Sequence, residues 1–250
     1  MAIPIHSAKD FEGMRKAGKL AAQVLDFITP HVQAGVSTLA LNDLCHDFII
    51  QHNAVPAPLN YKGFPKSICT SINHVICHGI PCASDILKEG DIMNIDVTVI
   101  VDGWHGDTSR MFTIGKIAKR AALLVDTTYQ CLMRAIDVVR PGTRLGDIGH
   151  VIQTIAESKG FSVVRDFCGH GIGRIFHTEP SVVHFGQKGT GQLLEEGMFF
   201  TIEPMINAGK WEMRLLPDDW TAITKDQSLS AQWEHTIAVT ADGAEIFTAS

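Results

Sequence analysis

Two stretches of this chain repeat each other at a fixed spacing, and this repeat limits the folds that the chain can adopt. LKEGDIMNID (87–96) and LEEGMFFTIE (194–203) share Leu, Glu, Gly, Ile and a final acidic residue, at an offset of 107 residues. Gly35 and Gly142, which each separate two predicted helices, lie 107 residues apart as well. A common offset in two places predicts an internal duplication.

The duplication predicts how the chain is organised. We expect one domain over 1–250, with halves at about 7–115 and 116–245 that are each built from helix, helix and strand. Asp96 and Glu203 are then equivalent positions on either side of a pseudo-twofold axis. Each half therefore brings acidic residues to a shared centre.

A second feature, NIDVTVIVDGWHGDTSRMF (94–112), reads as two alternating strands joined by an Asp-Gly dipeptide. Asp-Gly between such runs predicts a hairpin with a two-residue turn, although a bulged three-residue loop would shift its register. In the two-residue register Asp96 faces Ser109 and Asp107 faces Thr98. The two acids then share one face as diagonal neighbours, roughly 7–8 Å apart. Two carboxylates that close repel each other unless a cation lies between them, so the hairpin indicates a cation site.

Composition narrows the class of protein. The chain of 250 residues is 45% hydrophobic and 19% charged, which is typical of one globular unit with a large core. It has no apolar run near the ~20 residues that cross a bilayer, and its N-terminal stretch lacks the apolar core of a signal peptide. Six scattered cysteines predict reduced thiols in a cytoplasmic protein, and a net charge of −6 argues against nucleic-acid binding.

Periodicity predicts the remaining elements. We expect helices at 7–29, 38–52, 118–139 and 145–159, and strands near 67–76, 91–100, 105–113, 162–167, 181–184, 197–206 and 232–248.

Acidic and imidazole side chains recur in these strand-like segments, and the set is Asp96, Asp107, His170, Glu203 and Glu234. Taken singly, each has a structural explanation, since a strand Asp is usually an edge or turn residue and Glu234 could form a solvated pair with His235. Together, carboxylates with one imidazole suit Mn, Fe, Co or Zn. Bridging carboxylates of this kind can hold two metal ions about 3.5–4 Å apart.

The motifs around these residues resemble the type I methionine aminopeptidases across essentially the whole chain. The resemblance rests on ICHGIP (76–81), NIDVTVIVDGWHGDTSRMF, CGHGIGRIFHTEP (168–180), GMFFTIEPM (197–205) and WEHT (233–236). It implies an α+β pita-bread fold, in which two pseudo-symmetric halves place helices outside a curved antiparallel sheet. It also implies that 1–250 forms a single catalytic domain.

The resemblance implies roles for individual residues. Two divalent ions, Co(II), Mn(II), Fe(II) or Zn(II), would be held by Asp96, Asp107, His170, Glu203 and Glu234. Asp107 and Glu234 would bridge both ions. His78 and His177 match substrate-contacting histidines of the family. The methionine side chain would be bound by Tyr61, Phe64, Cys69, Phe176, Met205 and Trp220, although core packing explains Phe64 and Cys69 about as well.

The reaction implied is hydrolytic removal of an N-terminal methionine from peptides and nascent proteins, with a preference for a small second residue. A hydroxide bridging the ions would attack the scissile carbonyl, with Glu203 as base and then acid. His177 would stabilise the oxyanion, and His78 would bind the following backbone nitrogen. We expect a monomer that contacts the ribosome at most transiently and binds neither nucleic acid nor membrane.

The sequence leaves three alternatives open. An X-Pro aminopeptidase or dipeptidase shares the expected fold, but such relatives usually carry an additional N-terminal domain. A non-catalytic binding module of the same fold would typically have lost ligands, whereas all five positions are filled here. A Ser or Cys hydrolase would need a nucleophile motif such as G-x-S-x-G, and Cys77 and His78 are sequence neighbours on opposite strand faces. The sequence leaves the physiological metal open.

Overall fold

The structure, a computed structural model, describes residues 3–249 of the chain. Its helices are α1 (Ala8–Ile28), α2 (Thr38–Gln51), α3 (Lys119–Asp137) and α4 (Leu145–Ser158), with short 3-10 turns η1 (Thr29–His31) and η2 (Tyr61–Gly63). Its strands are β1 (Val55–Pro56), β2 (Cys69–Ile72), β3 (Val75–Cys77), β4 (Ile92–Val101), β5 (Trp104–Thr113), β6 (Ser162–Val163), β7 (Gly169–Gly171), β8 (Thr178–Val182), β9 (Phe199–Ile202), β10 (Met205–Asn207), β11 (Met213–Leu215), β12 (Ala222–Thr224), β13 (Ser230–Gln232), β14 (Glu234–Val239) and β15 (Ala244–Ile246).

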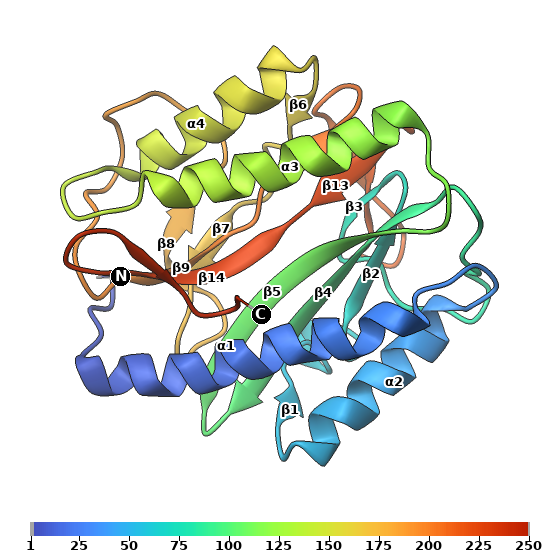
Figure 1. Cartoon of the computed structure of the whole chain (residues 1–250), viewed down its shortest axis with the longest axis horizontal. Helices are drawn as coiled ribbons and strands as arrows, with labels where there is room; N and C mark the ends of the chain where they lie inside the picture. The colour runs from blue at the N-terminus through green and yellow to red at the C-terminus, as the bar shows by residue number, and fades with distance from the viewer. Residues whose placement is uncertain (1–2, 250) are drawn as a thin grey trace.

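The central feature of the described chain is a nine-stranded antiparallel sheet. Its strands follow the order β1-β4-β5-β14-β9-β7-β8, while β2 also pairs with β4 and β15 with β14. The pairing of β5 with β14 joins the first half of the chain to the second. Figure 1 shows the sheet curving between the two helix pairs, with α1 and α2 along one part of it and α3 and α4 along the other.

Each helix pair covers its own part of the sheet with a separate apolar cluster. Helices α1 and α2 enclose buried side chains of β4, including Ile95 and Val97. Helices α3 and α4 enclose Phe200 and Ile202 of β9. Because side chains alternate along a strand, the residues between these positions face the opposite side of the sheet. Polar residues at the alternate positions can therefore gather away from the helices.

Helix α1 packs unusually close to β5, and Gly106 makes this approach possible. A Cβ atom at Gly106 would overlap the backbone of Ala17 in α1. The glycine precedes Asp107, so this close contact anchors the strand that carries one of the predicted metal ligands. The helix and the hairpin are thereby fixed relative to each other.

The predicted hairpin register is confirmed. Asp96 pairs with Ser109 and Thr98 with Asp107, as the two-residue turn requires. The turn residues Asp102 and Gly103 have φ values of 50° and 80°, as expected for the type of turn that Asp-Gly favours.

The four predicted helices are confirmed to within two residues at each end. Several predicted strands are shorter than expected or interrupted. The segment 67–76 divides into β2 and β3 at Asn73, whose φ of 53° makes a turn. The segment 197–206 divides at Pro204, which lacks the N–H group that a strand needs.

Other strand boundaries also differ from the prediction. The segment 232–248 contains β14 and β15 separated by a turn, 162–167 shortens to β6, and the strand expected at 181–184 is β8 at Thr178–Val182. Strands β1, β7, β11, β12 and most of β13 were not predicted, because segments of two or three residues are too short to show the alternation that identifies a strand.

The 107-residue offset recurs in backbone contacts. The N–H of Gly35 donates to the carbonyl of Leu87, and the N–H of Gly142 donates to the carbonyl of Leu194. An isolated bridge joins Ser37 to Ile86, and its counterpart joins Arg144 to Leu193. Equivalent contacts at equivalent positions support our proposal that the two halves are duplicated.

Among the described residues, no helix is both long and apolar enough to span a membrane.

Candidate metal centre and substrate pocket

A cavity of about 350 Å³ opens on the face of the sheet that the helices leave free. Every site residue predicted from the sequence lines this one cavity: Tyr61, Phe64, Cys69, His78, Asp96, Asp107, His170, Phe176, His177, Glu203, Met205, Trp220 and Glu234. The structure thus brings together side chains that are up to 173 residues apart, from Tyr61 to Glu234.

Five neighbouring strands supply the five candidate metal ligands. Asp96 lies on β4, Asp107 on β5, Glu234 on β14 and His170 on β7, while Glu203 directly follows β9. These strands are consecutive in the sheet. Both Asp96 and Glu234 also pair with the same residue of β5, Ser109, and so lie in one row across the sheet. The sheet topology alone therefore gathers the ligands.

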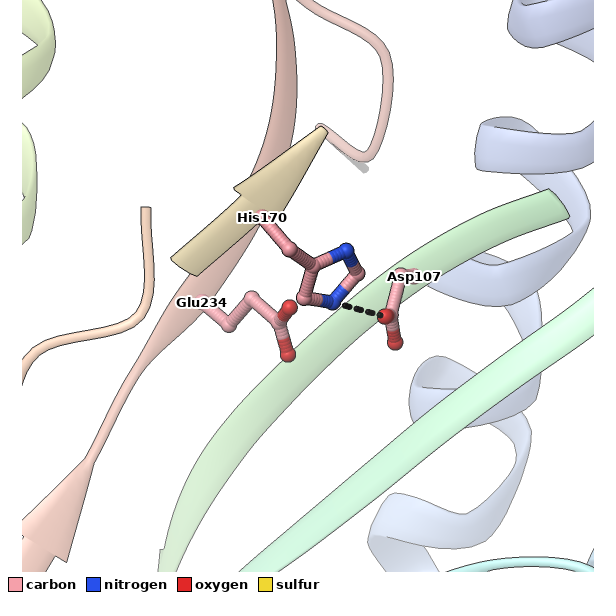
Figure 2. Close-up of side chains that lie close together, drawn as sticks. All are labelled: Asp107, His170 and Glu234. Carbon is pink, nitrogen blue, oxygen red and sulfur yellow. Dashed lines mark ion pairs between the residues drawn. The ribbon is translucent and has the colours of Figure 1, made fainter. Parts of the chain in front are cut away.

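The donor atoms point toward one another, as Figure 2 shows for Asp107, His170 and Glu234. One ligand atom from each of these three residues lies within 4.8 Å of the other two. Nε2 of His170 is 3.5 Å from Oδ2 of Asp107 and 3.8 Å from Oε1 of Glu203. The other nitrogen, Nδ1, is 3.0 Å from the carbonyl of Gly171, to which an N–H can donate. In the neutral imidazole this leaves Nε2, which faces the carboxylates, with a free lone pair.

The carboxylates lie where a negative charge is costly. Asp107 and Glu234 are only 4% and 2% exposed. Burial raises the pKa of Glu203 to about 7, although nearby His170 acts in the opposite direction. Burial and then the neighbouring carboxylates raise the pKa of Asp96 and of Glu234 well above the usual range. For His170 burial disfavours the imidazolium, but the adjacent acids outweigh it and raise its pKa.

These properties fit a bound divalent cation. A buried group of like charges is stabilised when an ion of opposite charge lies among it. The donors are carboxylate oxygens and one imidazole, the set that suits Mn, Fe, Co or Zn. No thiolate competes, because burial raises the pKa of Cys69 and Cys77 well above the usual range and keeps both as thiols.

Hydrogen bonds hold the candidate ligands in place. The sequence predicted that Thr98 faces Asp107 but did not predict these hydrogen bonds or the contacts of Thr201. Thr98 donates to Oδ1 of Asp107 at 2.7 Å. Thr201 donates to Oε1 of Glu203 at 2.8 Å and accepts from the backbone N–H of His170 at 3.0 Å. Hydrogen bonds from neighbouring residues to metal ligands usually orient those ligands. Alternation along β4 and β9 was the one sequence signal that could have identified both threonines.

Two further residues support Glu203. The side-chain amide of Gln232 lies 3.3 Å from Oε2 of Glu203. The backbone N–H of Glu203 donates to Nε2 of His184 at 3.2 Å. Nothing in its sequence context distinguishes His184 from a surface or core histidine, and the structure shows it fully buried behind the candidate ligand.

Two histidines at the cavity are held neutral. Burial lowers the pKa of His78 to about 4. Burial and then nearby His170 lower the pKa of His177 to about 3. His78 has a φ of 56°, an uncommon conformation for a residue other than glycine that is often found at functional sites. Both side chains can therefore act at neutral pH as uncharged hydrogen-bonding groups.

The apolar part of the cavity lies beside the acidic residues. The rings of Phe64 and Trp220 meet edge to face, with centroids 5.1 Å apart. Phe64, Cys69 and Met205 are almost completely buried. Phe167 also lines the cavity, edge-on to His78, and was not predicted because nothing in its sequence context distinguishes it from a core residue.

Comparison with known proteins identifies the family. The model of metallopeptidase family M24 matches residues 12–241. The chain belongs to metallopeptidase family M24. Membership of this family implies that it uses a divalent metal.

Methionine aminopeptidases are among the relatives of this chain. One from Rickettsia prowazekii (strain Madrid E) is 63% identical and covers 100% of this chain and 96% of its own length. One from Escherichia coli (strain K12) is 55% identical over 99% of this chain and 94% of its own length. The crystal structure of methionine aminopeptidase from Rickettsia prowazekii has a TM-score of 0.98 at 63% identity, covering 99% of this chain and 100% of that chain. The sequence-based recognition of the methionine aminopeptidases is confirmed.

The expected pita-bread fold is also confirmed by these structural neighbours. X-Pro aminopeptidase from Thermotoga maritima MSB8 has the same fold, with a TM-score of 0.77 at 17% identity, over 98% of this chain but 62% of that chain. At that identity the likeness concerns the fold alone. The methionine aminopeptidases, by contrast, match this chain at 55–63% identity.

Proposed function

We propose that this chain hydrolytically removes the N-terminal methionine from peptides and nascent proteins. The observation that carries the proposal is the meeting of five metal-type donors with a buried recess of aromatic and sulfur-containing side chains in one cavity. The identity of 55–63% to methionine aminopeptidases over nearly the whole chain supports it. A preference for a small second residue follows from the family resemblance.

Two divalent ions, Co(II), Mn(II), Fe(II) or Zn(II), would be held by the five donors Asp96, Asp107, His170, Glu203 and Glu234. When bound, such ions polarise the peptide carbonyl and lower the pKa of water so that hydroxide is present near neutral pH. The buried carboxylates favour binding of these ions, because the cations offset the repulsion between the carboxylates.

The recess would bind the methionine side chain. Tyr61, Phe64, Phe176 and Trp220 provide aromatic surfaces, and Cys69 and Met205 provide sulfur atoms. Polarisable groups of this kind make favourable contacts with a thioether. Phe64 and Met205 are almost completely buried, so the part of the recess that they line is apolar and shielded from solvent.

Two histidines would orient the peptide bond. Neutral His78 has a nitrogen that can accept from the backbone N–H that follows methionine. His177 would donate from its Nε2 to the carbonyl oxygen, where negative charge develops during attack. Both residues line the cavity that holds the candidate ligands.

Glu203 would move the proton. Its carboxylate takes the proton from the attacking water and passes it to the leaving nitrogen. The hydrogen bonds from Thr201 and Gln232 fix its two oxygens, so the carboxylate needs no rearrangement between the two transfers.

We further propose that the chain acts as a cytoplasmic monomer. The first half supplies Asp96 and Asp107 and the second half supplies His170, Glu203 and Glu234, so one chain completes the site. Nascent chains would provide the substrate termini, with ribosome contact at most transient.

A substrate panel tests the proposal. Protein loaded with Mn(II) is given Met-Ala-Ser, Lys-Ala-Ser and Ala-Pro, and the released amino acids are quantified. We expect methionine release, with little release of lysine and little cleavage of Ala-Pro. Preferential cleavage of Ala-Pro would favour the X-Pro alternative. Metal binding without cleavage of any peptide would favour a binding module.

A further inference from the structure

One contact at the cavity joins two residues that are 116 positions apart. The hydroxyl oxygen of Tyr61 lies 2.9 Å from Nδ1 of His177. The two rings are stacked, with centroids 5.1 Å apart and an interplanar angle of 25°. Both the hydrogen bond and the stacking fix the imidazole relative to Tyr61.

The backbone around Tyr61 is shaped to make this contact. Tyr61 begins the turn η2, and its two neighbours, Asn60 and Lys62, have φ values of 66° and 49°. Left-handed conformations are costly for residues other than glycine and are found where the surrounding structure requires them. Here they place the tyrosine ring over the cavity.

A further ring holds the pair from the side. Phe176 lies 4.8 Å from the ring of Tyr61 and 4.1 Å from that of His177. Phe176 in turn stacks on His105, whose Nδ1 is 3.0 Å from the carbonyl of Gly173 at the start of the same loop. Tyr61 and His177 are therefore held by packing as well as by their hydrogen bond.

The hydrogen bond bears on which nitrogen of His177 carries a proton. A neutral imidazole has one N–H group, and the partner of one nitrogen decides which nitrogen bears it. If the hydroxyl of Tyr61 donates to Nδ1, the proton must lie on Nε2. If Nδ1 donates to Tyr61 instead, Nε2 has only a lone pair and cannot donate to an oxyanion.

We propose that Tyr61 is a positioning residue, whose hydroxyl donates to Nδ1 of His177 and holds the proton on Nε2. This inference rests on the proposed role of His177 in donating to the carbonyl oxygen of the substrate. It gives the hydroxyl of Tyr61 a task separate from the apolar contacts of its ring. The ring would bind methionine, and the hydroxyl would prepare the oxyanion donor.

The chain offers a matched pair of variants, because it contains two tyrosines. Tyr61→Phe removes the hydroxyl and keeps the ring in the cavity. Tyr129→Phe removes the hydroxyl of a half-exposed residue on α3 that meets Trp233 edge to face. With Mn(II)-loaded protein and Met-Ala-Ser, we expect Tyr61→Phe to lower kcat about 3- to 10-fold, the effect of losing one hydrogen bond, with KM within about twofold. Tyr129→Phe should match the wild type.

A spectroscopic measurement separates this role from a general structural one. The tautomer of His177 is read from its ring ¹⁵N chemical shifts in protein loaded with diamagnetic Zn(II), and its signals are assigned as those lost in His177→Asn. We expect Nε2 to be protonated in the wild type and in Tyr129→Phe, and the two tautomers to mix in Tyr61→Phe.

The outcomes can be told apart. A proton on Nδ1 in the wild type, or unchanged kcat in Tyr61→Phe, would overturn the inference. If the wild-type protein itself released no methionine, the proposed function would fail, while the ¹⁵N shifts would still show whether Tyr61 sets the tautomer.

Discussion

Replacing Glu203 by glutamine should make the metal-stripped protein more stable relative to the wild type, and this gain should be larger at high pH than at low pH. The pKa of Glu203 is raised from its ordinary 4.5 to about 7, chiefly by burial. A group whose pKa is higher in the folded state contributes stability below its unfolded pKa, and that contribution is lost as the pH rises through the folded pKa. The wild type should therefore lose stability from this carboxylate between about pH 4 and pH 8.

The size of the loss follows from the two pKa values. Each factor of ten in proton affinity is worth about 1.4 kcal/mol, so the gap from 4.5 to about 7 gives about 3 kcal/mol. Glutamine has nearly the same shape and does not ionise. The free energy of unfolding of Glu203→Gln minus that of the wild type should thus increase by about 3 kcal/mol from pH 4 to pH 8.

The assay is urea unfolding in the presence of a chelator at several pH values. Using the difference between the two proteins removes the contribution of His78, His177 and His184, whose lowered pKa values change stability with the opposite sign. Glu196→Gln, at an exposed carboxylate, is the matched control and should show no such trend. With Mn(II) added, the wild type should become the more stable of the two proteins at pH 8, because the variant lacks one metal ligand. A stability difference that stays constant with pH would refute the idea that Glu203 is a buried carboxylate that requires a cation.

Three further perturbations have distinct expected results. Thr201→Val removes the hydroxyl that links Glu203 to the backbone of His170. Calorimetry should therefore show metal affinity reduced about 10- to 100-fold. Unchanged affinity would contradict an orienting role for Thr201. His78→Ala should lower kcat for Met-Ala-Ser at least about 10-fold, while mass spectrometry should show the same metal content as in the wild type. A large loss of metal would contradict the proposal that His78 contacts the substrate. Gly106→Ala should destabilise the protein by about 1–3 kcal/mol in urea unfolding, because its Cβ overlaps the backbone of α1, whereas Gly243→Ala has open space around it and serves as control.

Much of the site could be predicted from the sequence because its central part is a local structure. An Asp-Gly turn between alternating strands fixes register, and register fixes which side chains share a face, so the geometry of Asp96 and Asp107 followed from 94–112 alone. The repeat then related Glu203 to Asp96. The remaining ligands were found through the chemistry of their residue types together with the family resemblance.

The parts that escaped prediction depend on contacts between distant segments. The hydrogen bond between Tyr61 and His177 joins two loops. One loop is shaped by the left-handed residues beside Tyr61, and Phe176 packs against both rings. Thr201 and His184 are ordinary residue types whose importance appears only when the fold places them behind Glu203. Strand β7, which carries His170, has the sequence Gly-His-Gly and forms because its neighbours offer hydrogen bonds, against a weak intrinsic preference.

The most direct test of the central claim is methionine release from Met-Ala-Ser by chelator-stripped protein as Mn(II) is added back in known equivalents. The account predicts no release by the stripped protein and recovery that is complete by about two equivalents, in line with a dinuclear site. An Asp107→Asn variant measured alongside should fail to recover at these equivalents. Full activity of the stripped protein, or bound Mn(II) without any methionine release, would contradict the account.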